Sequence, residues 1–363
     1  MDWPIPFLAE EVWLRARRCL MIGLSEHDLV PSHSRYSDYM EVQNAKGEKL
    51  CRRFEHFLSD ECLLHFCSER FLGPDNKRFS QRLPITLAFG YECGYLLCQL
   101  GGGSSNGEKI EQSADCAALF NLASVLFDSL IDRAGLVNQI QTLLPRDRLF
   151  HLWSEASAAE EFLGSPELKS PNNQDLRVFA EVLAAFFKCA HCLKEVNSAT
   201  ICWTELWDAL DGAYSAQLAS VKKELTYKEA NDIGRKKSVA PFIIFSILSK
   251  LTNSDIQSTI ETNLAREVGE LIAGVDDLVD IESDLRLGNL NRVLPNAGLL
   301  GQTKDPRAIL AEVLTKNRIE VIAKDVLTHF EAILVILERN PAPLHVRNRF
   351  VEWMSMYLID WLR

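Results

Sequence analysis

Two groups of aspartates stand at helical spacing in this sequence of 363 residues. Asp128 and Asp132 are four residues apart, and Asp276, Asp280 and Asp284 repeat the same step twice. Residues four apart lie on one face of a helix, one turn above each other. Carboxylate oxygens, few per ion and with the other positions left to water and phosphate, suit Mg²⁺. The two groups together therefore predict a site that holds Mg²⁺ ions and a diphosphate.

The first group lies in the segment 117–131, which is apolar almost all the way round. Such a helix is normally buried in the middle of a protein. Two unpaired carboxylates there would each cost several kcal/mol, unless a proton, a cation or a metal neutralised them. The alternative is that Asp128 and Asp132 lie at a helix end and reach water, or pair with Arg133.

The second group places three acids on consecutive turns, with no Lys four residues after any of them. Each pair of like charges at this spacing costs about 0.2–0.5 kcal/mol. A solvated helix face would intersperse Lys, although an acidic surface stripe remains the alternative. Neither group contains His or Cys, which argues against zinc.

The cysteines raise a separate question of metal or redox chemistry. Cys189 and Cys192 form a CxxC pair with His191 between them. A zinc site needs four ligands, and no second pair at metal spacing is present. The same spacing places both thiols on one buried helix face, so packing is favoured and a redox role is the alternative. Ten cysteines without a secretion signal indicate reduced thiols and a cytoplasmic protein.

Composition excludes some classes of protein. The net charge is −11, with 39 basic and 50 acidic side chains, which argues against nucleic-acid binding. Asp2, Glu10 and Glu11 interrupt the first apolar stretch and break a signal-peptide pattern. No uninterrupted apolar run approaches the ~20 residues that cross a bilayer.

Helical periodicity runs through most of the chain, and alternating strand-like patterns are nearly absent. We predict an all-α antiparallel bundle forming one domain over residues 1–363. Its parts are N-terminal helices in 1–110, a core in 114–294 that carries both acidic motifs, and C-terminal helices in 306–363. The predicted helices are 7–24, 50–71, 114–133, 175–196, 203–225, 228–251, 255–287, 306–338 and 345–362.

The two aspartate groups, with the residues that follow them, resemble motifs of a known family. Asp128-Ser-Leu-Ile-Asp132-Arg133 and Asp276-xxx-Asp280-xxx-Asp284-xxx-Gly288-Asn-Leu290-Asn291 resemble the two metal motifs of class I terpenoid synthases. The resemblance is closest to the bacterial large terpene synthases, the tetraprenyl-β-curcumene synthase-like group. Both the DxxxD-Arg first motif and the DxxxDxxxD second motif, followed by Gly and Leu-Asn, are typical of that group. The resemblance covers residues 114–294.

A basic segment ahead of the second motif supports the same resemblance. Lys237-Ser238 resembles the Lys-Thr element of prenyl diphosphate synthases, which binds diphosphate one helix before the second metal motif. Arg235 is the alternative donor, and Arg133 adjoins the first motif. The resemblance thus implies diphosphate binding by Arg133, Arg235 and Lys237. A solvated helix end, or pairing with carboxylates that hold no metal, is the other interpretation.

The resemblance implies a bundle with a central active-site cavity and an enzyme that uses Mg²⁺, with three ions. Such an enzyme ionises an allylic prenyl diphosphate, of farnesyl length or longer, and releases diphosphate and a terpene hydrocarbon or alcohol. It also implies a monomer or homodimer. The lipophilic substrate would allow loose peripheral membrane contact, assisted by the amphipathic stretch 7–24, although a plain surface helix is the favoured interpretation of that stretch. The first motif lacks a paired Asp-Asp start and no Arg-Arg follows it, which disfavours chain elongation. A prenyl diphosphate synthase and a non-catalytic α-helical binding protein are the alternatives, and no catalytic base is identified.

Overall fold

All secondary structure that the structure describes is helical, which confirms the all-α prediction. The structure is a computed structural model. It describes residues 5–59, 79–101, 107–133, 136–170, 173–197, 200–221, 225, 227–252, 260–287, 291, 305–315 and 318–362. The chain divides into two compact units. Unit 1 comprises Met1–His33, Gly212–Ile243 and Thr262–Arg363, and unit 2 comprises Ser34–Asp211 and Ile244–Glu261.

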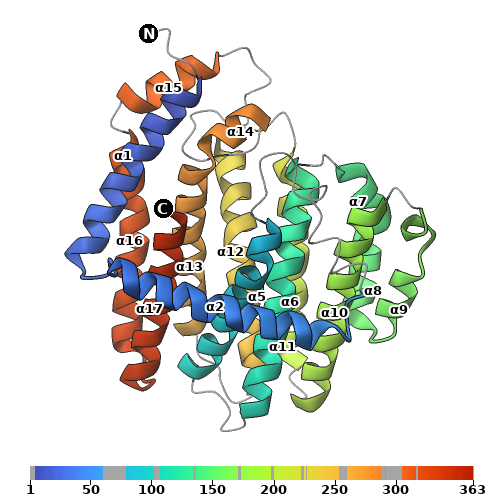
Figure 1. Ribbon diagram of the computed structural model, residues 1–363. Helices are drawn as coiled ribbons and strands as arrows, with labels where there is room; N and C mark the ends of the chain where they lie inside the picture. Colours follow the sequence, from blue (N-terminus) through green and yellow to red (C-terminus); the bar gives the residue numbers. More distant parts are fainter. Residues whose placement is uncertain are drawn as a thin grey trace. The chain divides into compact units, whose positions relative to one another are not determined.

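Unit 2 is organised around α6 (Gly107–Asp128), which packs between α5 (Phe79–Leu100) and α10 (Gln174–Asn197) (Figure 1). Side chains on every side of α6 are buried, which confirms that this apolar segment lies in a protein interior. The other elements of this unit are α2 (His33–Phe54), α7 (Val137–Leu143), α8 (Arg146–Ser154), α9 (Ala158–Leu163), the 3₁₀ turn Pro166–Leu168, and parts of α11 (Thr200–Ser220) and α12 (Tyr227–Leu251).

Glycines bring the helices of unit 2 into close approach. A Cβ added at Gly90 of α5 would lie 2.6 Å from the Cβ of Asn121 on α6. A Cβ added at Gly47 of α2 would lie 1.9 Å from the carbonyl oxygen of Pro84 on α5. At both places the backbone of one helix occupies the space in which a side chain would otherwise stand.

One described helical segment, Gly107–Ile131, is long and apolar enough to cross a membrane by length and composition. Of its most apolar window, 61% is buried inside the protein. The core helix of a globular protein passes the same test. The segment is therefore weak evidence for a membrane span.

Unit 1 holds the second acidic motif. Its helices are α1 (Ile5–Glu26), α13 (Ile260–Val279), α14 (Ile281–Leu287), α15 (Pro306–Thr315), α16 (Arg318–Arg339) and α17 (Leu344–Trp361), with the remaining parts of α11 and α12. α1 packs along α15 and α16 (Figure 1). Small residues again set the spacing: Gly269 of α13 faces Val239 of α12, and Gly274 faces Val326 of α16.

Some predicted helix boundaries were wrong. The predicted helix 50–71 begins within the last turn of α2, which ends at Phe54, and residues 60–71 of it lie outside the described residues. The predicted helix 255–287 is interrupted at Asp280, between α13 and α14. Residues 316–317, between α15 and α16, also lie outside the described part.

Candidate metal-binding helices

The three aspartates of the second motif follow one another across a break between two helices. Asp276 lies near the end of α13, Asp280 at the bend and Asp284 in α14. The backbone N–H of Asp280 donates to the carbonyl oxygen of Asp276 (2.9 Å), and that of Asp284 donates to Asp280 (2.8 Å). These are the i to i−4 bonds of an α-helix, so the helical turn continues through the bend. The three side chains therefore share one face, as the spacing predicts.

Asn291 lies against this motif. Its side chain is 3% exposed, and its amide nitrogen donates to Oδ2 of Asp284 (2.8 Å) and to the carbonyl oxygen of Asp277 (2.6 Å). The first bond orients the Asp284 carboxylate, and the second ties the residue to the end of α13. In the sequence, Asn291 stands out only as the last residue of the family motif. Its supporting role is evident only from these contacts.

Arg235 lies on α12 and pairs with a carboxylate of α13. Its Nε is 2.6 Å from Oε1 of Glu270, whose side chain is 6% exposed, whereas Arg235 itself is 52% exposed. The close approach at Gly269 brings these two helices together at the same level. Glu270 thus holds the Nε of the guanidinium, while half of the Arg235 side chain stays exposed. The sequence reasoning did not single out Glu270, because it lies off the aspartate face.

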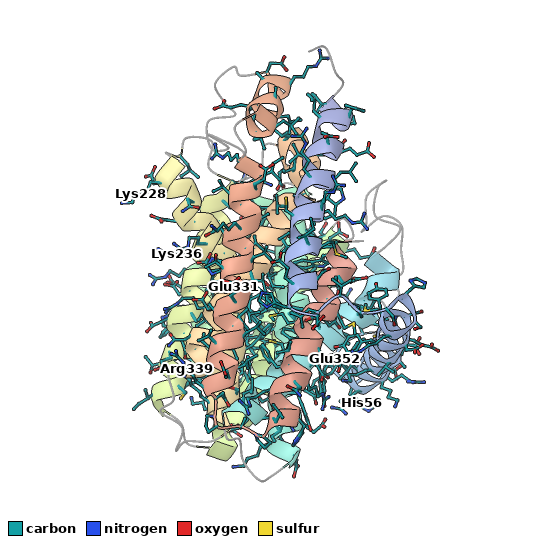
Figure 2. The ribbon with its side chains drawn as sticks, turned by 90° about the vertical axis from the view of Figure 1, so that its left-hand side faces the viewer. His56, Lys228, Lys236, Glu331, Arg339 and Glu352 are labelled. Carbon is teal, nitrogen blue, oxygen red and sulfur yellow. The ribbon has the colours of Figure 1, made fainter. Side chains whose placement is uncertain are left out.

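The rest of the basic segment points in different directions. Lys236 is exposed and projects outward from α12, as does Lys228 two turns earlier (Figure 2). Lys237 is partly buried and takes part in other contacts. Of the two diphosphate donors predicted here, Arg235 is the one placed by a described ion pair.

The Arg235 pair leads to a stability prediction. Arg235→Ala removes the guanidinium next to a buried carboxylate, so we expect it to lower the free energy of unfolding by about 2–3 kcal/mol. This value is below that of a fully buried pair because Arg235 is half exposed. In the Arg235→Ala/Glu270→Gln double variant most of the loss should be recovered, since the buried charge is gone. Urea denaturation measures the effect. The adjacent Lys236→Ala is the control, and an equal loss there would contradict the assignment.

The first motif lies in unit 2, where the helix changes its winding. α6 ends at Asp128, and Ser129–Arg133 continues as a π-helix. The Asp128 side chain is half-buried, which supports neither full burial nor a fully solvated end. The side chains of Asp132 and Arg133 lie outside the described residues. Single π-helical turns are rare and occur frequently at functional sites.

The oxygen ligands of the second motif can be compared with what Mg²⁺ requires. Among the described residues, no group of three or more His, Cys, Asp or Glu side chains is close enough to hold a metal ion. Mg²⁺ keeps several waters and is usually held by one or two carboxylates together with substrate phosphates. Carboxylates on successive turns, one of them oriented by an amide donor, fit that mode of binding. They do not form a cage for a structural metal.

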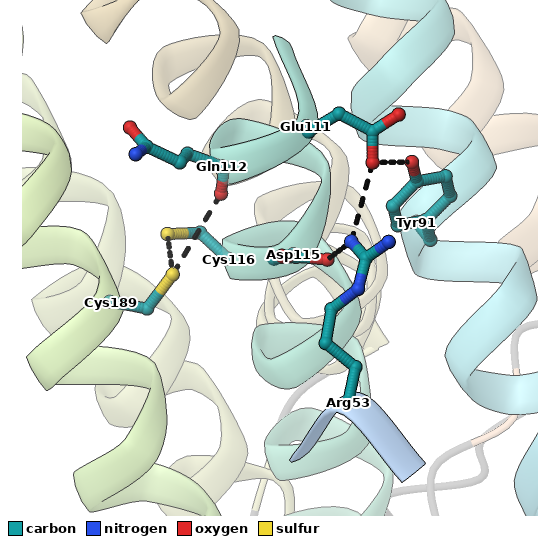
Figure 3. Close-up of polar contacts among 7 residues, drawn as sticks. All are labelled: Arg53, Tyr91, Glu111, Gln112, Asp115, Cys116 and Cys189. Carbon is teal, nitrogen blue, oxygen red and sulfur yellow. Dashed lines mark hydrogen bonds and ion pairs between the residues drawn. The ribbon is translucent and has the colours of Figure 1, made fainter. Parts of the chain in front are cut away.

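A second charged cluster lies in unit 2, where α2 meets α5 and α6 (Figure 3). Arg53 donates to Asp115 (2.7 Å) and Glu111 (3.3 Å), and the Tyr91 hydroxyl also donates to Glu111. Burial raises the pKa of Asp115 from 3.8 to about 6, because it outweighs the attraction of Arg53. Burial and the bond to Glu111 raise the pKa of Tyr91. The contacts are all within the protein, so this cluster joins helices.

The raised pKa of Asp115 predicts a pH dependence. Between about pH 4 and pH 6 the folded protein keeps a proton that the unfolded chain has released, so stability falls as the pH rises through this window. We expect the free energy of unfolding of wild type minus that of Asp115→Asn to fall by about 2–3 kcal/mol from pH 4 to pH 7. Urea titrations across this range measure it, and other carboxylates cancel in the difference. A difference independent of pH would contradict the raised pKa.

Comparison with family models and with curated proteins returned no match. The case for a function therefore depends on the residues of this chain and their geometry. Asp128 belongs to unit 2 and the second motif to unit 1, so each motif contributes to that case separately.

Proposed function

We propose that this protein is a Mg²⁺-dependent class I terpene synthase, a lyase that ionises an allylic prenyl diphosphate of farnesyl length or longer. Its product is a terpene hydrocarbon or alcohol, and diphosphate is released. The proposal includes a bundle of the class I type with a central cavity. The observation that carries it is the continuous face of Asp276, Asp280 and Asp284 across the break between α13 and α14.

A contact next to the break between α13 and α14 supports this function. An acidic face in an unbroken surface helix needs no supporting contacts, whereas Asp284 receives a hydrogen bond from the buried Asn291. A buried amide that hydrogen-bonds to a carboxylate fixes its orientation, and such bonds are typical of carboxylates that bind metal ions. Mutual repulsion of the three acids, about 0.2–0.5 kcal/mol for each neighbouring pair, is relieved when a cation is bound. The hydrogen bond from Asn291 is thus the contact that supports cation binding over a solvated stripe.

The chain's own residues have four tasks in this reaction. The Asp face would hold the cation, and the exposed part of Arg235 would bind diphosphate oxygens while Glu270 holds its Nε. Mg²⁺ held there would stabilise the negative charge of the departing diphosphate. Apolar side chains around the substrate would exclude water from a cationic intermediate. Aromatic faces stabilise such a cation by up to ~2 kcal/mol.

The test is a panel of substrates. Purified protein is incubated with geranyl, farnesyl, geranylgeranyl and longer prenyl diphosphates, with Mg²⁺ or with a chelator, and the products are analysed by gas chromatography and mass spectrometry. We expect a terpene product and diphosphate release from at least one substrate, only with Mg²⁺. Incorporation of added isopentenyl diphosphate would instead assign chain elongation. Folded protein that converts no substrate would contradict the proposal.

A further inference from the structure

Three cysteines gather where α6 packs against α10 in unit 2. The Sγ atoms of Cys116 on α6 and Cys189 on α10 are 2.6 Å apart, and Cys192 follows one turn later on α10. Figure 3 shows the first two thiols pointing toward each other across the helix interface. The separation is close to the bonding distance of about 2.05 Å for two sulfur atoms. Both residues are free cysteines in this structure.

The three thiols differ in their access to solvent. Cys116 is fully buried, Cys189 is partly exposed, and Cys192 is exposed. Cys189 also donates to the backbone carbonyl oxygen of Gln112 at 3.8 Å. Burial and the neighbouring Cys189 raise the pKa of Cys116. A small oxidant can therefore reach Cys189 but not Cys116.

A shared metal ion does not explain this cluster. Among the described side chains, no group of three ligating residues is close enough to hold one. His191, between the two cysteines of the CxxC pair, has its Nε2 3.0 Å from the carbonyl oxygen of Leu152. Its ring also packs against Trp203, with centroids 5.0 Å apart. The histidine is thus engaged in the core, which leaves a pair of facing thiols.

We propose that Cys116 and Cys189 form an intramolecular disulfide when the protein meets a small disulfide of the glutathione class, and that Cys192 stays outside this bond. The sequence pattern alone favours packing for these cysteines, with a redox role for Cys189 and Cys192 as the alternative. Cys189 and Cys192 share one face of α10, whereas the thiol of Cys116 lies opposite that of Cys189 on a neighbouring helix. This inference does not depend on the proposed synthase activity.

The reaction proceeds by two thiol–disulfide exchanges. The Cys189 thiolate attacks one sulfur of the oxidant RSSR, giving a Cys189–SR mixed disulfide and one RS⁻. The Cys116 thiolate then attacks Sγ of Cys189 and expels the second RS⁻. The two protons lost by the cysteines end on two RSH molecules. The protein dithiol is oxidised by two electrons, and the oxidant is reduced by two.

The bond would join two central helices of unit 2 over a long stretch of chain. It would close a loop from residue 116 to residue 189, and long loops gain most from such a link. The bond would also hold α6 at Cys116, which lies about 18 Å along the helix from Asp128. Oxidation would thus stiffen the helix that carries the first acidic motif.

Tryptic peptides make the test direct. The full-length protein is treated with oxidised glutathione in its native state, and then unfolded and alkylated. Trypsin releases 110–133, in which Cys116 is the only cysteine, and 189–194, which holds both Cys189 and Cys192. We expect a disulfide-linked pair of these peptides, two hydrogen atoms lighter than their sum, which disappears on reduction.

Cysteine variants show which cysteine of the peptide 189–194 forms the disulfide with Cys116. The linked pair should persist in Cys192→Ser and vanish in Cys189→Ser. Thermal unfolding should show the oxidised wild type and Cys192→Ser melting about 5 °C above their reduced forms, with no such rise in Cys189→Ser. The proposal is overturned if Cys116 is recovered fully alkylated or bound only to glutathione, or if the link requires Cys192.

Discussion

Asp280→Asn is expected to slow Mg²⁺-dependent diphosphate release at least ~100-fold at saturating substrate. Asp280 is the middle member of the acidic face and lies at the bend between α13 and α14. The amide keeps the size of the side chain and one oxygen, but it loses the negative charge that attracts the cation. Initial rates of diphosphate release across a Mg²⁺ titration measure the effect.

Measuring the stability of Asp280→Asn distinguishes this loss of activity from misfolding. Because Asp280 has an acid four residues away on either side, Asp280→Asn removes two repulsive pairs, worth about 0.2–0.5 kcal/mol each. The amide also keeps the shape of the side chain, so the variant should unfold at a urea concentration close to that of the wild type while its activity falls. Glu282→Gln is the matched control, since Glu282 is exposed on α14 and lies off the aspartate face. Unchanged activity in Asp280→Asn would remove the main support for the synthase proposal.

Gly47→Ala should destabilise the protein by at least ~3 kcal/mol. The added Cβ would lie 1.9 Å from the carbonyl oxygen of Pro84 and 2.2 Å from its carbonyl carbon. Both are backbone atoms of α5, so no side-chain rotation can relieve the clash and the two helices must separate. Urea denaturation followed by circular dichroism measures the loss.

Gly212→Ala is the matched control for this prediction. Gly212 lies within α11, and a Cβ there would meet no atom within 4 Å. In a helix interior Ala is favoured over Gly by roughly 0.5–1 kcal/mol, so this variant should be slightly more stable than the wild type. A similar loss in both variants would mean that the close approach of α2 and α5 does not explain the effect.

The helices that sequence reasoning found are those with an apolar stripe. Periodicity predicted α1, α6, α10, α12 and α17 because apolar residues repeat along one face or all round. It missed α2, whose buried face includes Gln43 and Gly47 beside Met40 and Leu50. Gly47 lets α2 approach α5 closely, and because it has no side chain it also interrupts the apolar pattern of α2. α5 was missed for a related reason, because Pro84 and Gly90 lie inside it.

The candidate site, like the helices, was predictable from the sequence only in part. Spacing alone placed the three aspartates of the second motif on one face, and the backbone bonds agree with it. The partners Asn291 and Glu270 were not predictable as such, because each depends on how separate segments meet. The facing thiols of Cys116 and Cys189 are the clearest case, since 72 residues separate them in the chain.

The position of α1 has a consequence for synthesis on the ribosome. Its apolar face, which includes Leu8, Val12 and Leu20, is buried mainly against α15 and α16, the first of which begins at Pro306, 280 residues after α1 ends. At translation rates of about 5–20 residues per second, those partners emerge roughly 15–60 seconds later. During that interval the nascent helix exposes an apolar surface without its main native partners, so we expect chaperones that hold unfinished chains to bind it.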